Sequence, residues 1–118
     1  MQRTHEMKLN PAPFAMIRDG KKTIELRLYD EKRQLISVGD RIEFENTEDA
    51  EQKILARVVK LHIFDSFDAL YRVLPLTRCG YAEEELSAAS PRDMERYYAP
   101  EDIRRFGVVG IELGMVGR

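Results

Sequence analysis

The chain has 118 residues, of which 43% are hydrophobic and 34% are charged, and its formal net charge is -2. This composition excludes a disordered or fibrous protein, and no apolar run approaches the roughly 20 residues of a membrane helix. The length suits one core, so we expect a single domain over residues 1–118. Residues 1–41 carry 9 Lys or Arg against 6 Asp or Glu, which fits either a small phosphate-bearing partner or ordinary surface charge.

Cysteine and histidine are too few and too scattered for covalent or metal crosslinks. Cys79 is the single cysteine, so an intrachain disulfide is excluded and a reducing cytoplasm is the expected location. His5, His62 and Cys79 lack the spacing of metal ligands, so we expect neither a metal site nor a cofactor.

The chain begins with a predicted strand and a short helix. A weakly alternating strand over 5–9 ends at Asn10, and Pro11 with Pro13 opens a helix that runs through Ile17. Gly20 stands where a left-handed residue would end this helix.

The next stretch, 20–33, is the predicted site. Its middle is a predicted strand over 23–28, in which polar residues alternate with Ile24, Leu26 and Leu28. The apolar face anchors the strand in a core. We therefore expect the opposite face, with Thr23, Glu25, Arg27 and Tyr29, to be presented to a ligand.

Three further β segments follow. After a charged turn over 30–35 and a turn at 38–40, a strand is predicted over 41–45, then a polar loop over 46–51. The segment 53–64 is long and changes its apolar parity between Val58 and Val59, which a β-bulge or barrel corner explains.

The last third is predicted to be mainly helical. Ser66 caps a helix that Pro75 stops, and its apolar spacing assigns Phe67, Leu70, Tyr71 and Leu74 to the core. Pro91 and Pro100 open two short helices, Gly107 ends the second, and a buried strand follows over 108–113. The order is β-α-β-β-β, a helical insert and a final β, which predicts an α+β fold, a small mixed β-barrel with helices packed at its rim.

The most specific motifs are Pro13-Phe14, the run Gly20-Lys21-Lys22-Thr23-Ile24-Glu25-Leu26-Arg27, and Gly39-Asp40 before a strand. With Tyr97-Tyr98 and the run over 107–111, they resemble the ASCH domain family in its bacterial single-domain form. The resemblance implies a PUA-like barrel, a cleft beside the first helix and second strand, and binding of RNA or nucleotides.

The chemistry of these side chains is compatible with that role. Lys22 can reach into a cleft, Arg27 offers a planar fork for phosphate or a base edge, and Glu25 can accept from a base amino group. Thr23 shares their face, and Lys32 and Arg33 would contact phosphates at the rim. Tyr98, or else Tyr29 or Tyr97, would supply a stacking surface. The alternative for Glu25 and Arg27 is a surface ion pair worth under about 1 kcal/mol.

Two other functions stay open. One branch of the family resembles amidohydrolases that deacetylate acetylcytidine with a lysine, a threonine three residues later and a distant glutamate. Here Lys22 matches the lysine, Glu25 stands in the place of the threonine, and Glu83, Glu84 and Glu85 are candidates for the glutamate. Lys22 and Glu25 are thus candidate catalytic residues of a nucleoside hydrolase or ribonuclease. The last alternative is a regulatory domain that binds another protein.

Overall fold

The computed structural model describes residues 2–116, and its elements follow the predicted order. The strands are β1 (Thr4–Leu9), β2 (Ile24–Leu28), β3 (Arg41–Asn46), β4 (Asp49–Phe64) and β5 (Val108–Met115). The α-helices are α1 (Pro11–Arg18), α2 (Phe67–Val73) and α3 (Pro100–Phe106). Four short 3-10 helices complete the fold: η1 (Arg33–Leu35), η2 (Leu76–Cys79), η3 (Glu83–Ala88) and η4 (Pro91–Arg96).

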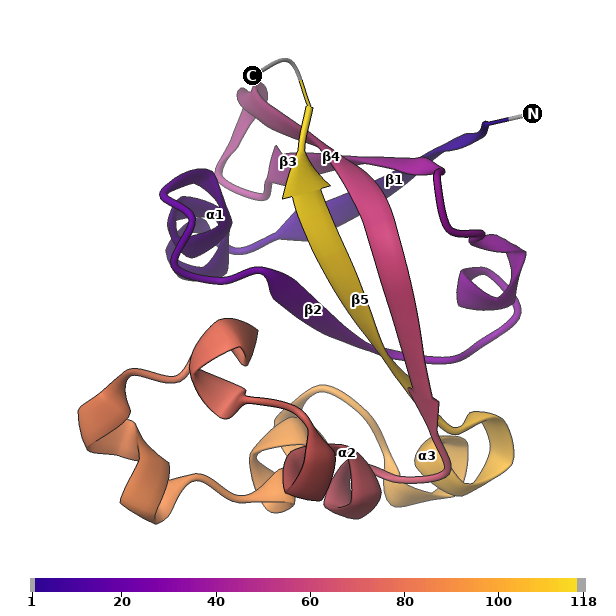
Figure 1. The fold of residues 1–118 in the computed structure, drawn as a ribbon, viewed down its shortest axis with the longest axis vertical. Coiled ribbons are helices and arrows are strands. Elements are labelled where there is room, and N and C mark those ends of the chain that lie inside the picture. The colour runs from indigo at the N-terminus through magenta and orange to yellow at the C-terminus, as the bar shows by residue number, and fades with distance from the viewer. Residues whose placement is uncertain (1, 117–118) are drawn as a thin grey trace.

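The five strands form one curled sheet in the order β1-β3-β4-β5-β2. β1 and β3 are parallel, whereas the other neighbours are antiparallel. The long β4 pairs with β3 through its first half and with β5 through its second, and the β4–β5 register shifts between Val58 and Lys60. This irregularity coincides with the predicted change of parity. Figure 1 shows the resulting half-barrel, with α1 at one side and the helical insert below, so the expected fold class is confirmed.

Two apolar clusters hold the fold together. One fills the inside of the curled sheet with Met7, Leu9, Phe14, Ile17, Ile36, Ile42, Phe44, Ile54, Ala56, Val58, Val109, Ile111 and Leu113. The other joins the sheet to residues 65–107, here called the insert, through Ile24, Leu26, Phe67, Leu70, Leu74, Cys79 and Val108. Both clusters include residues of β5, so β5 is covered on two faces.

Local sequence signals predict several of the observed helix ends. Gly20 has a φ of +78°, as the predicted end of α1 requires. The Ser66 hydroxyl accepts from the Ala69 amide at 3.2 Å, which confirms the cap of α2. The loop predicted over 46–51 is shorter than expected, because β3 reaches Asn46 and β4 already begins at Asp49. Within residues 2–116, no helix is long and apolar enough to cross a membrane.

Candidate functional site

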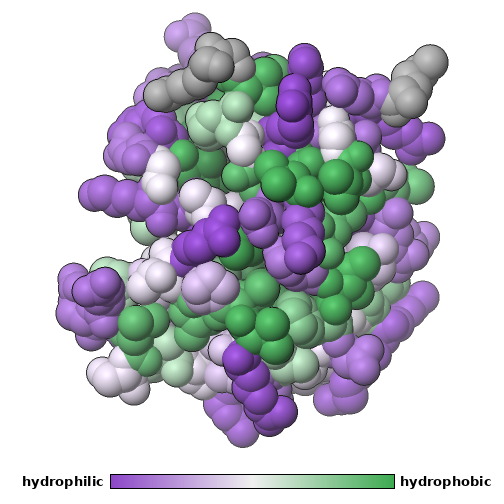
Figure 2. All heavy atoms as spheres, in the orientation of Figure 1, coloured by the Kyte–Doolittle hydropathy of each residue, from purple (hydrophilic) through white to green (hydrophobic). Residues whose placement is uncertain are grey.

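A cleft of about 770 Å³ lies between the barrel and the insert. The barrel wall is formed by the end of β1, by α1 and by β2, and the insert wall by residues from Tyr71 to Tyr98. In Figure 2 the outline is indented at the left, between α1 above and the 3-10 helices below. The polar side chains that line the cleft are Lys8, Asn10, Lys22, Glu25, Arg27, Tyr71, Tyr81, Glu84, Glu85, Asp93, Arg96, Tyr97 and Tyr98.

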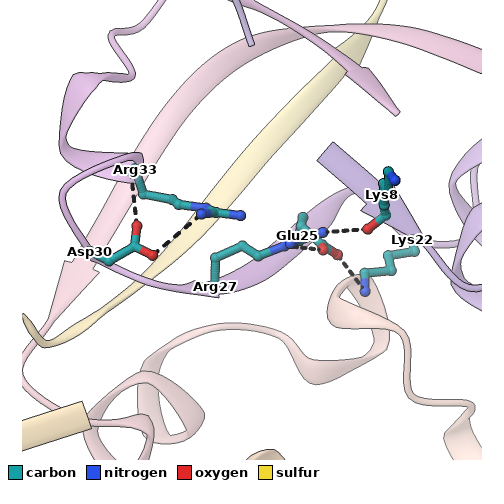
Figure 3. A network of polar contacts seen from close by, with 6 residues as sticks. All are labelled: Lys8, Lys22, Glu25, Arg27, Asp30 and Arg33. Atoms are coloured by element: carbon teal, nitrogen blue, oxygen red, sulfur yellow. Dashed lines mark hydrogen bonds and ion pairs between the residues drawn. The ribbon is translucent and has the colours of Figure 1, made fainter. Parts of the chain in front are cut away.

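Three of the predicted residues meet on the barrel wall. Lys22 Nζ lies 2.8 Å from Glu25 Oε1, and Arg27 Nε donates to Glu25 Oε2 at 2.7 Å. Figure 3 shows the two cations approaching the carboxylate from opposite sides. We call Lys22, Glu25 and Arg27 the Glu25 cluster.

The Glu25 cluster is buried, which differs from the expected exposed strand face. The Glu25 side chain is only 5% exposed, against 11% for Lys22 and 15% for Arg27. Glu25 pairs with Ile111 of the inner cluster, so this face of β2 is turned into the curled sheet, which the alternation within β2 does not reveal. The insert packs on the opposite face, against Ile24 and Leu26. A surface ion pair is therefore the wrong description of Glu25 and Arg27.

The charges around Glu25 keep it ionised despite its burial. Burial alone would raise the pKa of Glu25, but the Lys22 ammonium and the Arg27 guanidinium together hold that pKa below its usual range. The Lys22 ammonium is the close partner of Oε1, and the buried Oε1 has no further hydrogen-bond partner among the described residues. A ligand N–H group would therefore reach this oxygen by taking the place of Lys22.

Arg27 also joins the two edge strands of the sheet. Its Nη2 donates to the carbonyl oxygen of Lys8 at 3.0 Å, which links β2 to β1 across the open side of the barrel. We call this open side the seam. Because one guanidinium holds both Glu25 and the seam, most of its donor geometry is fixed before any ligand arrives.

A second hollow, of about 410 Å³, adjoins Lys8 and Arg27 and also includes the two other predicted basic residues. Lys32 is exposed there, whereas Arg33 is partly buried and its Nη1 lies 3.3 Å from Asp30 Oδ2. Three glutamates, Glu6, Glu43 and Glu45, line the same hollow. Lys32 and Arg33 therefore lie beside the cleft rather than in it.

The remaining predicted residues are more dispersed. Thr23 Oγ1 accepts from Arg78 Nε at 2.8 Å, and Thr23 is not part of the cleft lining. Tyr98 does line the cleft, but one ring face stacks on Phe67 at a centroid distance of 6.2 Å, and burial raises its pKa. Tyr97, also at the cleft, is 62% exposed.

The three candidate glutamates of the insert differ in position. Glu84 and Glu85 line the cleft, whereas Glu83 does not. Glu85 Oε1 accepts from the Ala82 amide at 2.7 Å, so its carboxylate caps η3. Only Glu84 combines a place at the cleft with an exposed position and no such bond.

Sequence reasoning missed a chain of hydroxyls on the insert wall. Tyr71 Oη lies 2.8 Å from Tyr81 Oη, and Tyr81 Oη donates to Asp93 Oδ2 at 2.7 Å. All three residues line the cleft. The helical spacing of Tyr71 predicts a core position, and no periodic pattern links it to Tyr81 and Asp93, which belong to irregular and 3-10 segments.

Among residues 2–116, no group of three or more His, Cys, Asp or Glu side chains is arranged to hold a metal ion. Cys79 is buried, and this raises its pKa to about 11, so it is a protonated thiol at neutral pH. The polar groups that line the cleft include carboxylates, ammonium, guanidinium and phenol groups.

Comparisons with known proteins agree on the fold. A family model described as the ASCH domain matches residues 7–115. The crystal structure of hypothetical protein PH0355 is 30% identical with a TM-score of 0.78, and the match covers 96% of this chain and 99% of that one. Protein PF0455 from Pyrococcus furiosus, solved by NMR, is 31% identical with a TM-score of 0.70, covering 98% and 99%.

A more distant structure has the same fold. ASCH from Zymomonas mobilis is 19% identical with a TM-score of 0.65, and the match covers 95% of this chain and 67% of that chain. No curated protein matches this sequence.

Proposed function

Because the chain belongs to the ASCH domain family, we propose that it binds RNA or a nucleotide in the cleft between β2 and the insert. The Glu25 cluster carries this proposal, because it gathers a buried acceptor and two cations on one wall of a cleft of about 770 Å³. That volume lies in the range of small-molecule sites, roughly 300–1,000 Å³.

Each member of the proposed site has a distinct role. Lys22 contacts a phosphate or base oxygen, Glu25 Oε1 accepts from a base N–H, and Arg27 positions Glu25 while its guanidinium edges the cleft. Tyr98, with the more exposed Tyr97, supplies aromatic surface beside the base.

The second hollow extends the proposed site toward a chain of phosphates. Lys32 and Arg33 line it together with Arg27, which is shared with the cleft. Thr23 is left out of the proposed contacts because its hydroxyl bonds to Arg78. The presence of Cys79 as the single cysteine supports a reducing location, for which we propose the cytoplasm.

Salt-dependent binding tests this proposal. With Lys22, Lys32 and Arg33 on phosphates, log affinity for a labelled single-stranded RNA should fall against log salt with a slope of about −2, measured by fluorescence anisotropy. Lys22→Ala should make that slope less steep by about 0.7. The double variant Lys32→Ala with Arg33→Ala should make it less steep by about twice as much.

Lys60→Ala is the matched control, because Lys60 is exposed on β4 and lines neither cavity. It removes the same charge and should leave the slope unchanged. Absence of RNA and nucleotide binding by the wild-type protein, or an equal loss in Lys60→Ala and Lys22→Ala, would count against the proposal.

A second candidate function, hydrolysis of a modified nucleoside, is supported by the contact of Lys22 with Glu25 inside the cleft. In this role Lys22 and Glu25 are the acid–base pair that transfers a proton to or from the nucleoside, and Glu84 on the insert is the additional carboxylate. Turnover of acylated nucleosides and labelled RNA, followed by chromatography, tests it. Turnover that persists in Lys22→Ala would exclude this assignment.

A further inference from the structure

The hydrogen-bond chain Tyr71–Tyr81–Asp93 has a direction that its atoms determine. Its far end is the Asp93 carboxylate, which accepts from Tyr81 at 2.7 Å and also from the Ser90 amide at 3.1 Å. A phenol carries one proton, and Tyr81 gives its proton to Asp93. Tyr81 therefore has only lone pairs to offer Tyr71, so Tyr71 must be the donor across the 2.8 Å contact between them.

The protonation states at neutral pH agree with this direction. The Tyr81 hydroxyl and the Ser90 amide hold the pKa of Asp93 below its usual range, so Asp93 is an anion and cannot donate. Burial raises the pKa of Tyr81 and of Tyr71, so both phenols keep their protons. The direction therefore follows from the charge of one carboxylate.

The outcome for the cleft is a fixed acceptor. The Tyr71 proton is committed to Tyr81, and Tyr71 lines the cleft, so its oxygen can offer only lone pairs to a ligand. The ring cannot easily turn away, because it packs edge-on against Phe67 at 6.4 Å and against Tyr81 at 6.0 Å.

We propose that the Tyr71–Tyr81–Asp93 chain makes Tyr71 a specificity-determining acceptor, which selects ligands with an amino or other N–H donor over ligands with a carbonyl at the same place. This inference rests on the proposed function and narrows its ligand class. Cytosine carries an amino group at the position where uracil carries a carbonyl oxygen. A carbonyl facing Tyr71 would leave two acceptors in contact, each without its hydrogen bond.

The test compares binding of cytidine-only and uridine-only oligoribonucleotides of equal length by fluorescence anisotropy. The wild-type protein should prefer the cytidine oligomer by about 3- to 10-fold, the ratio that one hydrogen bond provides. Tyr71→Phe should bring the ratio of the two affinities closer to one. The affinity for the cytidine oligomer should fall, and the affinity for the uridine oligomer should stay the same or rise.

Two variants separate the direction of the chain from packing. Tyr81→Phe removes the group that takes the Tyr71 proton, and Asp93→Asn adds a donor that permits the chain to run in reverse. Either change frees Tyr71 to donate, so uridine binding should rise relative to cytidine. A role in packing alone would weaken both oligomers equally. Tyr29→Phe is the control, because Tyr29 does not line the cleft, and it should keep the wild-type ratio.

The outcomes separate a failure of the Tyr71 inference from a failure of the proposed function. Binding without a preference for cytidine, or a ratio that Tyr71→Phe, Tyr81→Phe and Asp93→Asn leave unchanged, would overturn the inference and leave the proposed function standing. Failure of the wild-type protein to bind either oligomer or any nucleotide would overturn both. A ratio that shifts in these three variants and not in Tyr29→Phe establishes the inference.

Discussion

The two walls of the cleft place their polar groups by different means. On the barrel wall, Glu25 sits on β2, which pairs with β5 along its length, and its partners are two full charges. On the insert wall, Tyr71, Tyr81 and Asp93 come from three separate segments and are joined by their own side-chain hydrogen bonds. One wall is positioned by backbone pairing, the other by side-chain contacts among residues that also line the cleft.

This difference has consequences for substitution. A substitution on the barrel wall leaves β2 in place but leaves a buried charge without its partner. Its main cost in stability is therefore electrostatic. A change on the insert wall removes neutral or singly charged bonds from a segment in which residues 82–88 are all exposed. Its main effect should be local loosening, with little effect on the barrel.

The largest effect is expected on the barrel wall. Glu25→Ala leaves the Lys22 and Arg27 cations buried without their counter-ion, which should lower the free energy of unfolding by about 3–5 kcal/mol. Urea denaturation followed by circular dichroism measures this loss. Glu48→Ala, at an exposed position in the β3–β4 loop, should change stability little, and an equal loss in both variants would contradict the electrostatic explanation.

An intermediate effect is expected where the insert returns to the barrel. At Gly107, φ is +73°, and an added Cβ would lie 2.8 Å from the Phe64 carbonyl oxygen. Gly107→Ala should therefore cost about 1–3 kcal/mol in thermal or urea unfolding. Gly39→Ala is the matched control, because its φ is +96° but nothing lies within 4 Å of the added Cβ. If both variants lose the same stability, backbone strain alone accounts for the effect and the close approach to Phe64 does not.

The smallest effect is expected on the insert wall and depends on pH. The pKa of Asp93 is lowered from 3.8 in the folded protein, so its contribution to stability is present above that value and is lost as the pH falls through the folded pKa. Asp93→Asn should remove this acid-dependent part, about 0.5–1.5 kcal/mol, the contribution of a typical hydrogen bond.

Hydrogen exchange of the insert amides, compared between neutral and acidic pH, measures this acid-dependent contribution of Asp93 to stability. Asp65→Asn, at an exposed position of the insert, should retain the wild-type pH dependence. An acid response that Asp93→Asn leaves intact would mean that the insert wall is not held through Asp93.

The sequence predicts the barrel better than it predicts the insert. Alternation identifies the strands, and prolines, Ser66 and Gly20 identify where helices begin and end, because these are local properties of the chain. The change of parity at Val58 even marks the register shift between β4 and β5. In contrast, the path over residues 76–89 contains two short 3-10 helices, Leu76–Cys79 and Glu83–Ala88, joined by irregular residues, without a period that a pattern could detect.

The same distinction applies to the site. Glu25 and Arg27 share a strand face, so their contact could be expected from β alternation. The burial of Glu25 could not, because it depends on the pairing of β2 with β5 near the other end of the chain, which turns this face toward the inner cluster of the curled sheet. Thr23 has the same parity, yet Arg78 of the insert occupies its hydroxyl. Tyr71 has the spacing of a core residue, and only the fold reveals its hydrogen bond to Tyr81.

The seam between β1 and β2 has a mechanical consequence. Every neighbouring pair in the sheet is held by a ladder of backbone bonds, whereas the guanidinium of Arg27 spans the seam to the Lys8 carbonyl. Opening the seam breaks this side-chain bond, whereas separating two neighbouring strands breaks a ladder of backbone bonds. If the proposed ligand draws Arg27 away from Lys8, the seam loses this bond, so binding at the proposed site and the stiffness of the barrel would be coupled through one side chain.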